Sequence, residues 1–323
     1  MTAGPEVTDP ARSGYSLANL GELLFACLDA IGAKSVVEIG AFKGDLTRAL
    51  LEWSAESGAR VTAVELQPPP ELEGLSEQRP ELELVRASSE DALPGLPLPD
   101  ALIIDGDHNY YTVSQELRLV EEKASGPDMP LLIFHDVSWP HGRRDVYHSP
   151  DRVPEEHRQP LARDAVLAPG EAGVADAGLR YEWVARREGG PRNGVLTAIE
   201  DFADGRDGVR TAIIPAFFGV GVVWHRDSPW AGAVAEIVRP WDRNPVLERL
   251  EANRVEQLIE RLRDEVEYSQ IIHRERERRA SQEHVLRAML GSKAFAWGEW
   301  LSRLRQGGRP AFSREQVRRT LGE

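Results

Sequence analysis

The sequence has a single cysteine, Cys27, among its 323 residues. One thiol excludes an internal disulfide, so a reducing compartment such as the cytoplasm is the expected location. No apolar run approaches the roughly 20 residues that a membrane-spanning helix needs. The N-terminus also lacks the basic start and apolar stretch that are typical of a signal peptide. We therefore expect no transmembrane segment.

Basic side chains are in deficit. The chain has 39 Lys and Arg against 53 Asp and Glu, a formal net charge of −14. Nonspecific nucleic-acid binding depends on a basic surface, so this balance disfavours it. Apolar residues make up 41% of the chain, which is enough for a substantial core. The length fits one large domain with an appendage, or two small domains.

Short apolar runs alternate with amphipathic segments as far as residue 137. The runs predict strands, and the segments between them have the apolar spacing of helices. This alternation predicts an α/β fold with a parallel sheet that helices cover on both faces. The expected strands lie at 35–40, 60–66, 82–88, 101–106 and 130–137, and the expected helices at 17–33, 45–57 and 111–125.

The alternation stops after Asp136. Residues 138–193 are rich in Pro, Gly, Arg and Asp, and a connection of this length predicts a lid or a substrate-binding insertion. Residues 209–226 then predict two strands joined by a tight turn near Phe218 and Gly219. The expected parts are a flexible tail at 1–16, a domain at 17–243 that includes the insertion, a long helix at 244–290, and a basic amphipathic tail at 291–323.

The expected long helix is charged and has an imperfect apolar seam. Two interpretations stay open: a coiled-coil or helix-pair contact in a homo-oligomer, or a solvated helix that lies on its own domain. The tail after it either covers a hydrophobic patch or contacts a membrane surface or a partner. The seam consists of Val255, Leu258, Leu262, Val266 and Ile272.

The segment "SVVEIGAFKGDLTRALL" contains the first chemical signal. A glycine-containing turn joins an expected strand to an expected helix, and ligands of open α/β sheets bind at this end of the strands. Gly40 and Gly44 would let the backbone approach a ligand, or would simply make a tight turn. The spacing differs from the G-x-G-x-x-G that binds a dinucleotide pyrophosphate. Glu38 would repel phosphates and suits a cationic ligand. Glu65, at the tip of the next strand, is placed to accept hydrogen bonds from both hydroxyls of a ribose.

These two stretches resemble motif I and the acidic second motif of class I S-adenosylmethionine-dependent methyltransferases. The resemblance spans roughly residues 17–137 and 194–226. It implies a Rossmann-like seven-stranded sheet whose last strand is antiparallel, here with a long insertion after the fifth strand and a long C-terminal helix. It implies S-adenosylmethionine as cofactor, with Ser88 and Ser89 near the adenine. The implied cofactor residues are Glu38, Gly40, Ala41, Gly44, Glu65, Leu66, Ser88, Ser89 and Asp105.

A group of polar residues follows the next two expected strands. Asp105 ends one strand, and His135 and Asp136 end its neighbour, so all three should face one crevice. Carboxylate and imidazole groups suit a divalent cation, and the oxygen donors favour Mg²⁺ or Mn²⁺. Such a cation would lower the pKa of a substrate hydroxyl, and His108 would act as general base. Alternatively, Asp107 or His108 caps the following helix, or His108 is a structural partner of Asp136.

This pattern resembles the metal-dependent O-methyltransferases of sugars and macrolides, and relatives of the cephalosporin-biosynthesis methyltransferase. Asp105 and Asp136 match their metal ligands and His108 matches their base, whereas His135 stands where the family usually has Glu or Asp. The favoured function is methyl transfer to a hydroxyl of a small molecule or glycan. The alternatives are an NAD-type oxidoreductase and a non-catalytic scaffold in a biosynthetic complex.

The insertion offers candidate acceptor contacts. Three aromatic side chains suit stacking on a sugar or aromatic acceptor, and two arginines suit a phosphate or carboxylate. In the alternative, this is a surface loop whose arginines pair with acids of the chain itself. The candidates are Trp139, Tyr147, His148, Arg143 and Arg144.

Overall fold

The computed structural model describes residues 14–305 and 313–321, except for the side chains at 265, 266 and 303. The flexible tail expected at 1–16 therefore lies largely outside the described residues. The chain forms two compact units, 1–259 and 260–323, and each is described by itself.

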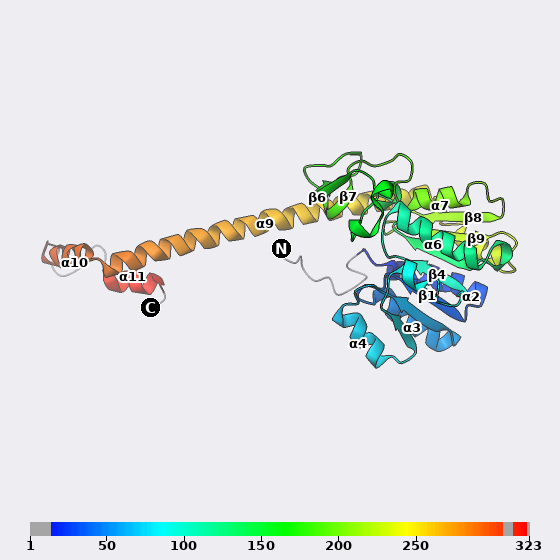
Figure 1. Cartoon of the computed structure of the whole chain (residues 1–323). Coiled ribbons are helices and arrows are strands. Elements are labelled where there is room, and N and C mark those ends of the chain that lie inside the picture. Colours follow the sequence, from blue (N-terminus) through cyan, green and yellow to red (C-terminus); the bar gives the residue numbers. More distant parts are fainter. Residues whose placement is uncertain (1–13, 306–312, 322–323) are drawn as a thin grey trace. The chain divides into compact units, whose positions relative to one another are not determined.

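The first unit is built on a seven-stranded sheet with the order β3-β2-β1-β4-β5-β9-β8 (Figure 1). The five strands before the insertion pair in parallel, and β9 pairs with β5 in the antiparallel direction. This confirms the expected sheet with an antiparallel last strand. The strands are β1 Ser35–Ile39, β2 Arg60–Val64, β3 Leu82–Val85, β4 Ala101–Ile104, β5 Leu131–His135, β8 Val209–Ile214 and β9 Val220–His225.

Helices cover both faces of the sheet, because successive strand residues point to opposite sides. Val36 belongs to the core on one face, and Val37 belongs to the core on the other. The first face carries α2 Gly21–Ile31, α3 Asp45–Ser57, α4 Pro70–Gln78 and α8 Ala231–Val238; the second carries α5 Ser89–Ala92, α6 Tyr110–Lys123 and α7 Val195–Ala203. Short 3₁₀ turns lie at Leu17–Leu20, Gly126–Asp128, His141–Arg143, Pro150–Arg152 and Glu155–His157.

The insertion has a sheet of its own, in which β6 Leu161–Leu167 pairs with β7 Leu179–Ala185. Asp145 ties this substructure to the main domain. Its buried carboxylate accepts hydrogen bonds from the backbone N–H groups of Tyr110 and Gly194, which lie at the starts of α6 and α7. The insertion is thus anchored at two helix N-termini.

Three helices follow the sheet domain: α9 Pro245–Gly291, α10 Lys293–Arg305 and α11 Arg314–Leu321. The long helix expected at 244–290 is confirmed. Within the first unit, Val255 and Ile259 of α9 are buried, whereas the side chain of Val266 lies outside the described residues. Among the described residues, no helix is both long enough and apolar enough to cross a membrane.

Candidate active site

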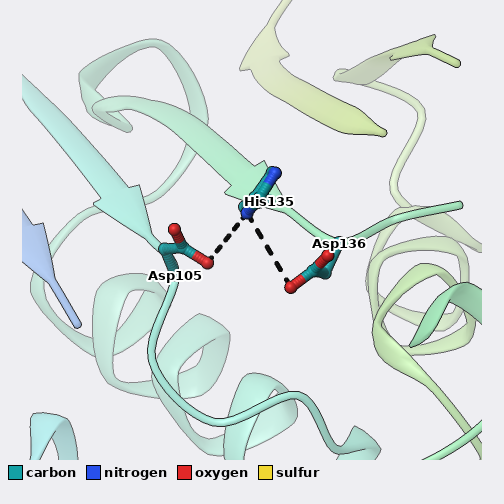
Figure 2. Close-up of side chains that lie close together, drawn as sticks. All are labelled: Asp105, His135 and Asp136. Carbon is teal, nitrogen blue, oxygen red and sulfur yellow. Dashed lines mark hydrogen bonds and ion pairs between the residues drawn. The ribbon is translucent and has the colours of Figure 1, made fainter. Parts of the chain in front are cut away.

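Asp105, His135 and Asp136 meet at the carboxyl ends of β4 and β5. Figure 2 shows the His135 ring between the two carboxylates. Its Nδ1 lies 3.0 Å from Asp105 Oδ1 and 3.8 Å from Asp136 Oδ2. One potential ligand atom from each residue falls within 4.8 Å of the other two. The structure therefore brings together the three residues that the sequence predicted as cation ligands.

The partners of His135 fix its protonation. Its Nε2 lies 2.8 Å from the carbonyl oxygen of Phe217, which only accepts hydrogen bonds, so Nε2 carries a proton. Burial alone would lower the pKa of His135, but the carboxylates of Asp105 and Asp136 raise it to about 10. Without a cation, Nδ1 is therefore also protonated at neutral pH and donates to Asp105.

Asp136 is surrounded by histidines. Its backbone has a φ of 59°, in the left-handed region, and its Oδ1 and Oδ2 lie 3.0 Å from His141 Nδ1 and 3.2 Å from His108 Nδ1. Burial would raise the pKa of Asp136, but the three neighbouring imidazoles, His141 foremost, hold it well below the usual range. The carboxylate therefore stays ionised inside the domain.

His108 is set up as a neutral imidazole. Burial lowers the pKa of His108 to about 3, although Asp136 opposes the change. Because a carboxylate only accepts, the ring nitrogen that faces Asp136 carries the hydrogen of the neutral ring, which leaves Nε2 as an acceptor. The backbone supports this position, since Val146 of the insertion donates to the carbonyl of His108. His108 is thus both a partner of Asp136 and a candidate proton acceptor.

Two supporting residues were missed by the sequence analysis. His141 lies in a 3₁₀ turn of the insertion, and its ring centroid is 4.8 Å from that of His108. Glu251, near the start of α9, accepts hydrogen bonds from the backbone N–H groups of Phe217 and Phe218, at 3.0 Å and 2.8 Å. Glu251 thereby holds the turn whose carbonyl contacts His135. For His141, the only signal in the sequence was a histidine soon after the fifth strand. For Glu251, the sequence contained no signal.

The glycine loop packs directly against this cluster. Gly40 has a φ of 82°, and a Cβ there would lie 2.1 Å from the carbonyl oxygen of Asp105. Gly40 is therefore required by the close approach of the loop to the end of β4. Glu65 accepts hydrogen bonds from Phe42 N–H and Gln67 N–H, so its carboxylate faces the same loop.

The other predicted cofactor residues differ in their surroundings. Glu38 is buried and accepts a 2.6 Å hydrogen bond from Thr47, and burial raises its pKa to about 8. Ser88 is the N-cap of α5. The remaining ones differ in exposure: Ala41 and Ser89 are buried, Gly44 precedes α3 in a left-handed conformation, and Leu66 is 40% exposed.

One sequence expectation about α6 is wrong. Asn109, rather than Asp107, caps this helix, because its side chain accepts a hydrogen bond from Thr112 N–H. Asp107 instead accepts hydrogen bonds from the Asn109 amide and from His148 N–H. It therefore supports the cap and joins it to the insertion.

The candidate acceptor arginines are already engaged. Arg143 pairs with Glu200 of α7, and the fully buried Arg144 donates to four backbone carbonyls. Tyr147 is buried as well and donates to Asp145. The arginine pairing agrees with the alternative interpretation, in which the insertion satisfies its own charges. Of the five predicted acceptor contacts, only His148 is exposed.

Comparison with known proteins finds a family model that matches part of the sheet domain. Residues 37–137 match a family model described as a methyltransferase domain. This match extends from within β1 to just after β5, and the strand order of the sheet agrees with a Rossmann-like methyltransferase fold. No curated protein matches the sequence significantly.

The solved structures that this chain is similar to are distant. SAH-bound PaMTH1 from Podospora anserina is 16% identical, with 68% of this chain and 83% of that chain covered and a TM-score of 0.42. A methyltransferase from Geobacter sulfurreducens is 13% identical, with 67% and 83% covered and a TM-score of 0.38.

Proposed function

We propose that the chain transfers a methyl group from S-adenosylmethionine to a hydroxyl of a small molecule or glycan, and that a divalent cation, Mg²⁺ or Mn²⁺, assists. The observation that most supports this proposal is the cluster of Asp105, His135 and Asp136 beside the glycine loop of a methyltransferase domain. The domain also favours this function over the NAD-type alternative.

The residues present fit a cation. Ligand atoms around one Mg²⁺ or Mn²⁺ ion are about 3 to 4 Å apart, because each lies about 2.1 Å from it. His135 Nδ1 is 3.0 Å and 3.8 Å from the two carboxylate oxygens. The opposite nitrogen, Nε2, donates to a backbone carbonyl, which is the usual arrangement of a metal-binding histidine.

The cation and the neighbouring residues would have separate roles in the reaction. When bound, the cation would lower the pKa of the acceptor hydroxyl. His108 Nε2 takes the hydroxyl proton, and the charge of the ionising acceptor oxygen, together with Asp136, raises the low pKa of this imidazole by stabilising the imidazolium that forms. The new O–CH₃ bond forms as the S–CH₃ bond breaks, which leaves S-adenosylhomocysteine.

The cofactor would lie along the strand ends on the other side of Gly40. In this arrangement Glu38 binds the ammonium group of the methionine moiety, and Glu65 accepts hydrogen bonds from the ribose hydroxyls. The adenine lies near Ser88 and Ser89. Ala41, Gly44, Leu66 and Asp105 complete the proposed cofactor contacts.

Calorimetry with S-adenosylmethionine, followed by a methyl-transfer screen of hydroxylated acceptors, tests the proposal. We expect the wild-type chain to bind the cofactor, and EDTA to abolish turnover that Mg²⁺ or Mn²⁺ restores. Asp136→Asn should bind S-adenosylmethionine but lose cation-dependent turnover. Full activity after chelation, with elemental analysis showing no metal, would exclude the cation. Failure to bind the cofactor would favour the scaffold interpretation.

A further inference from the structure

Helix α10 has an exposed apolar face that the methyltransferase site does not use. Four large side chains recur at helical spacing along the outer face: Trp297, Trp300, Leu301 and Leu304. Their exposed fractions are 67%, 56%, 51% and 64%. Phe295, Ala296, Glu299 and Ser302, on the opposite face, are half-buried. The helix therefore packs through one face and presents two Trp and two Leu side chains on the other.

The segment that contains α10 has a net charge of the opposite sign from that of the whole chain. Residues 291–323 contain seven basic and three acidic residues, a net charge of +4, whereas the whole chain carries −14. Exposed Lys293 and Arg305 flank the apolar face at the two ends of the helix. A surface that combines clustered positive charge with exposed Trp and Leu is complementary to an anionic lipid headgroup layer.

The two tryptophans indicate which kind of partner surface α10 would bind. Their rings pack at 74° with centroids 6.0 Å apart, so they form one aromatic patch. Trp prefers the boundary between headgroups and acyl chains, because its ring is apolar and its N–H is polar. With 13 residues, α10 is shorter than the roughly 20 residues that span a bilayer, and it would lie along the interface.

We propose that α10 binds the surface of an anionic lipid bilayer. Trp297, Trp300, Leu301 and Leu304 enter the interface, and Lys293, Arg305, Arg318 and Arg319 contact the lipid phosphates. This inference is independent of the methyl-transfer reaction, and it concerns where the enzyme binds rather than what it catalyses.

Co-sedimentation of the full-length chain with vesicles tests the proposal. Vesicles of equal parts phosphatidylglycerol and phosphatidylcholine should bind the wild-type chain, and phosphatidylcholine vesicles should bind it at least about tenfold less. Trp297→Ala combined with Trp300→Ala should lower the partition coefficient by about tenfold or more, because two rings that enter the lipid interface are lost. Trp241→Ala is the matched control, since Trp241 is 44% exposed in the first unit, and it should bind like the wild type.

A second variant covers the case in which the double tryptophan variant does not fold. Arg318→Glu combined with Arg319→Glu leaves the apolar face intact and should lower binding to the anionic vesicles by a similar factor. Equal binding to both vesicle types, or wild-type binding by either folded variant, would overturn the proposal. So would a loss of self-association in the tryptophan variant without vesicles, because the face would then be a contact between protein chains.

Discussion

Cation binding should compete with a proton at His135, and the structure sets the size of the effect. The carboxylates of Asp105 and Asp136 raise the pKa of this imidazole to about 10. A cation at Nδ1 must displace that proton. At pH 7 the displacement costs about 4 kcal/mol, since each pKa unit corresponds to about 1.4 kcal/mol. Cation affinity is then about 10³-fold weaker than for the deprotonated ring.

Whether cation affinity rises or falls with pH follows from the direction of the pKa shift. His135 is protonated below about pH 10, so raising the pH removes the competitor and strengthens cation binding. Between about pH 6.5 and about pH 8.5 the affinity for Mn²⁺ should rise about tenfold per pH unit. Calorimetry in two buffers of different ionisation enthalpy should detect release of close to one proton per Mn²⁺ bound.

A matched variant isolates the histidine. Asparagine at position 135 offers an amide oxygen as a ligand and has no titratable proton. His135→Asn should therefore release almost no proton at position 135 and show an Mn²⁺ affinity nearly independent of pH. S-adenosylmethionine binding serves as the control for folding. Binding of Mn²⁺ to the wild-type chain without proton release, and with equal affinity across this range, would refute the reasoning about Nδ1.

Four further outcomes are expected. Glu65→Ala should weaken S-adenosylmethionine binding by about 1–3 kcal/mol, the usual loss for hydrogen bonds to a charged group; unchanged affinity in the calorimeter would remove Glu65 from the cofactor site. His108→Ala should keep cation and cofactor binding but slow methyl transfer by about 10²–10⁴-fold in single-turnover assays. Glu251→Ala should weaken Mn²⁺ binding more than cofactor binding, because it frees the Phe217 turn that holds His135; equal losses would indicate general destabilisation. A chain that ends at Ile259 keeps Glu251 and should lose self-association if the later seam of α9 is the oligomer contact; sedimentation showing the same protomer number as the full chain would contradict this.

The sheet was predictable because its strands are buried on both faces. Segments such as "ALII" and "LLIF" are apolar throughout, and their alternation with helical segments predicts that the strands run parallel. The insertion gave no comparable signal. Its core is a small cluster of Val146, Ala165, Leu167 and Val184, whose members come together only when β6 and β7 pair. Composition therefore marked 138–193 as irregular although it contains a sheet.

The ligand-type residues of the site were predictable for a topological reason. Asp105, His135 and Asp136 lie at the carboxyl ends of adjacent parallel strands, so the pairing of these strands brings them to one edge. His141 and Glu251 depend on tertiary contacts instead. Glu251 reaches the turn at Phe217 from a helix 34 residues later in the sequence, and no periodicity reports such a contact.

His135 gives the cluster a different charge balance from that of a site made of carboxylates alone. With an acidic residue at this position, a ligand set with Asp105 and Asp136 would carry three negative charges, which repel one another unless a cation is present. With histidine, the protonated ring lies between the two carboxylates and neutralises one of them without any metal. The charges of the cluster are therefore partly balanced even without a cation. Its occupancy in the cell would depend on pH and cation concentration together, because one proton leaves for each cation that binds.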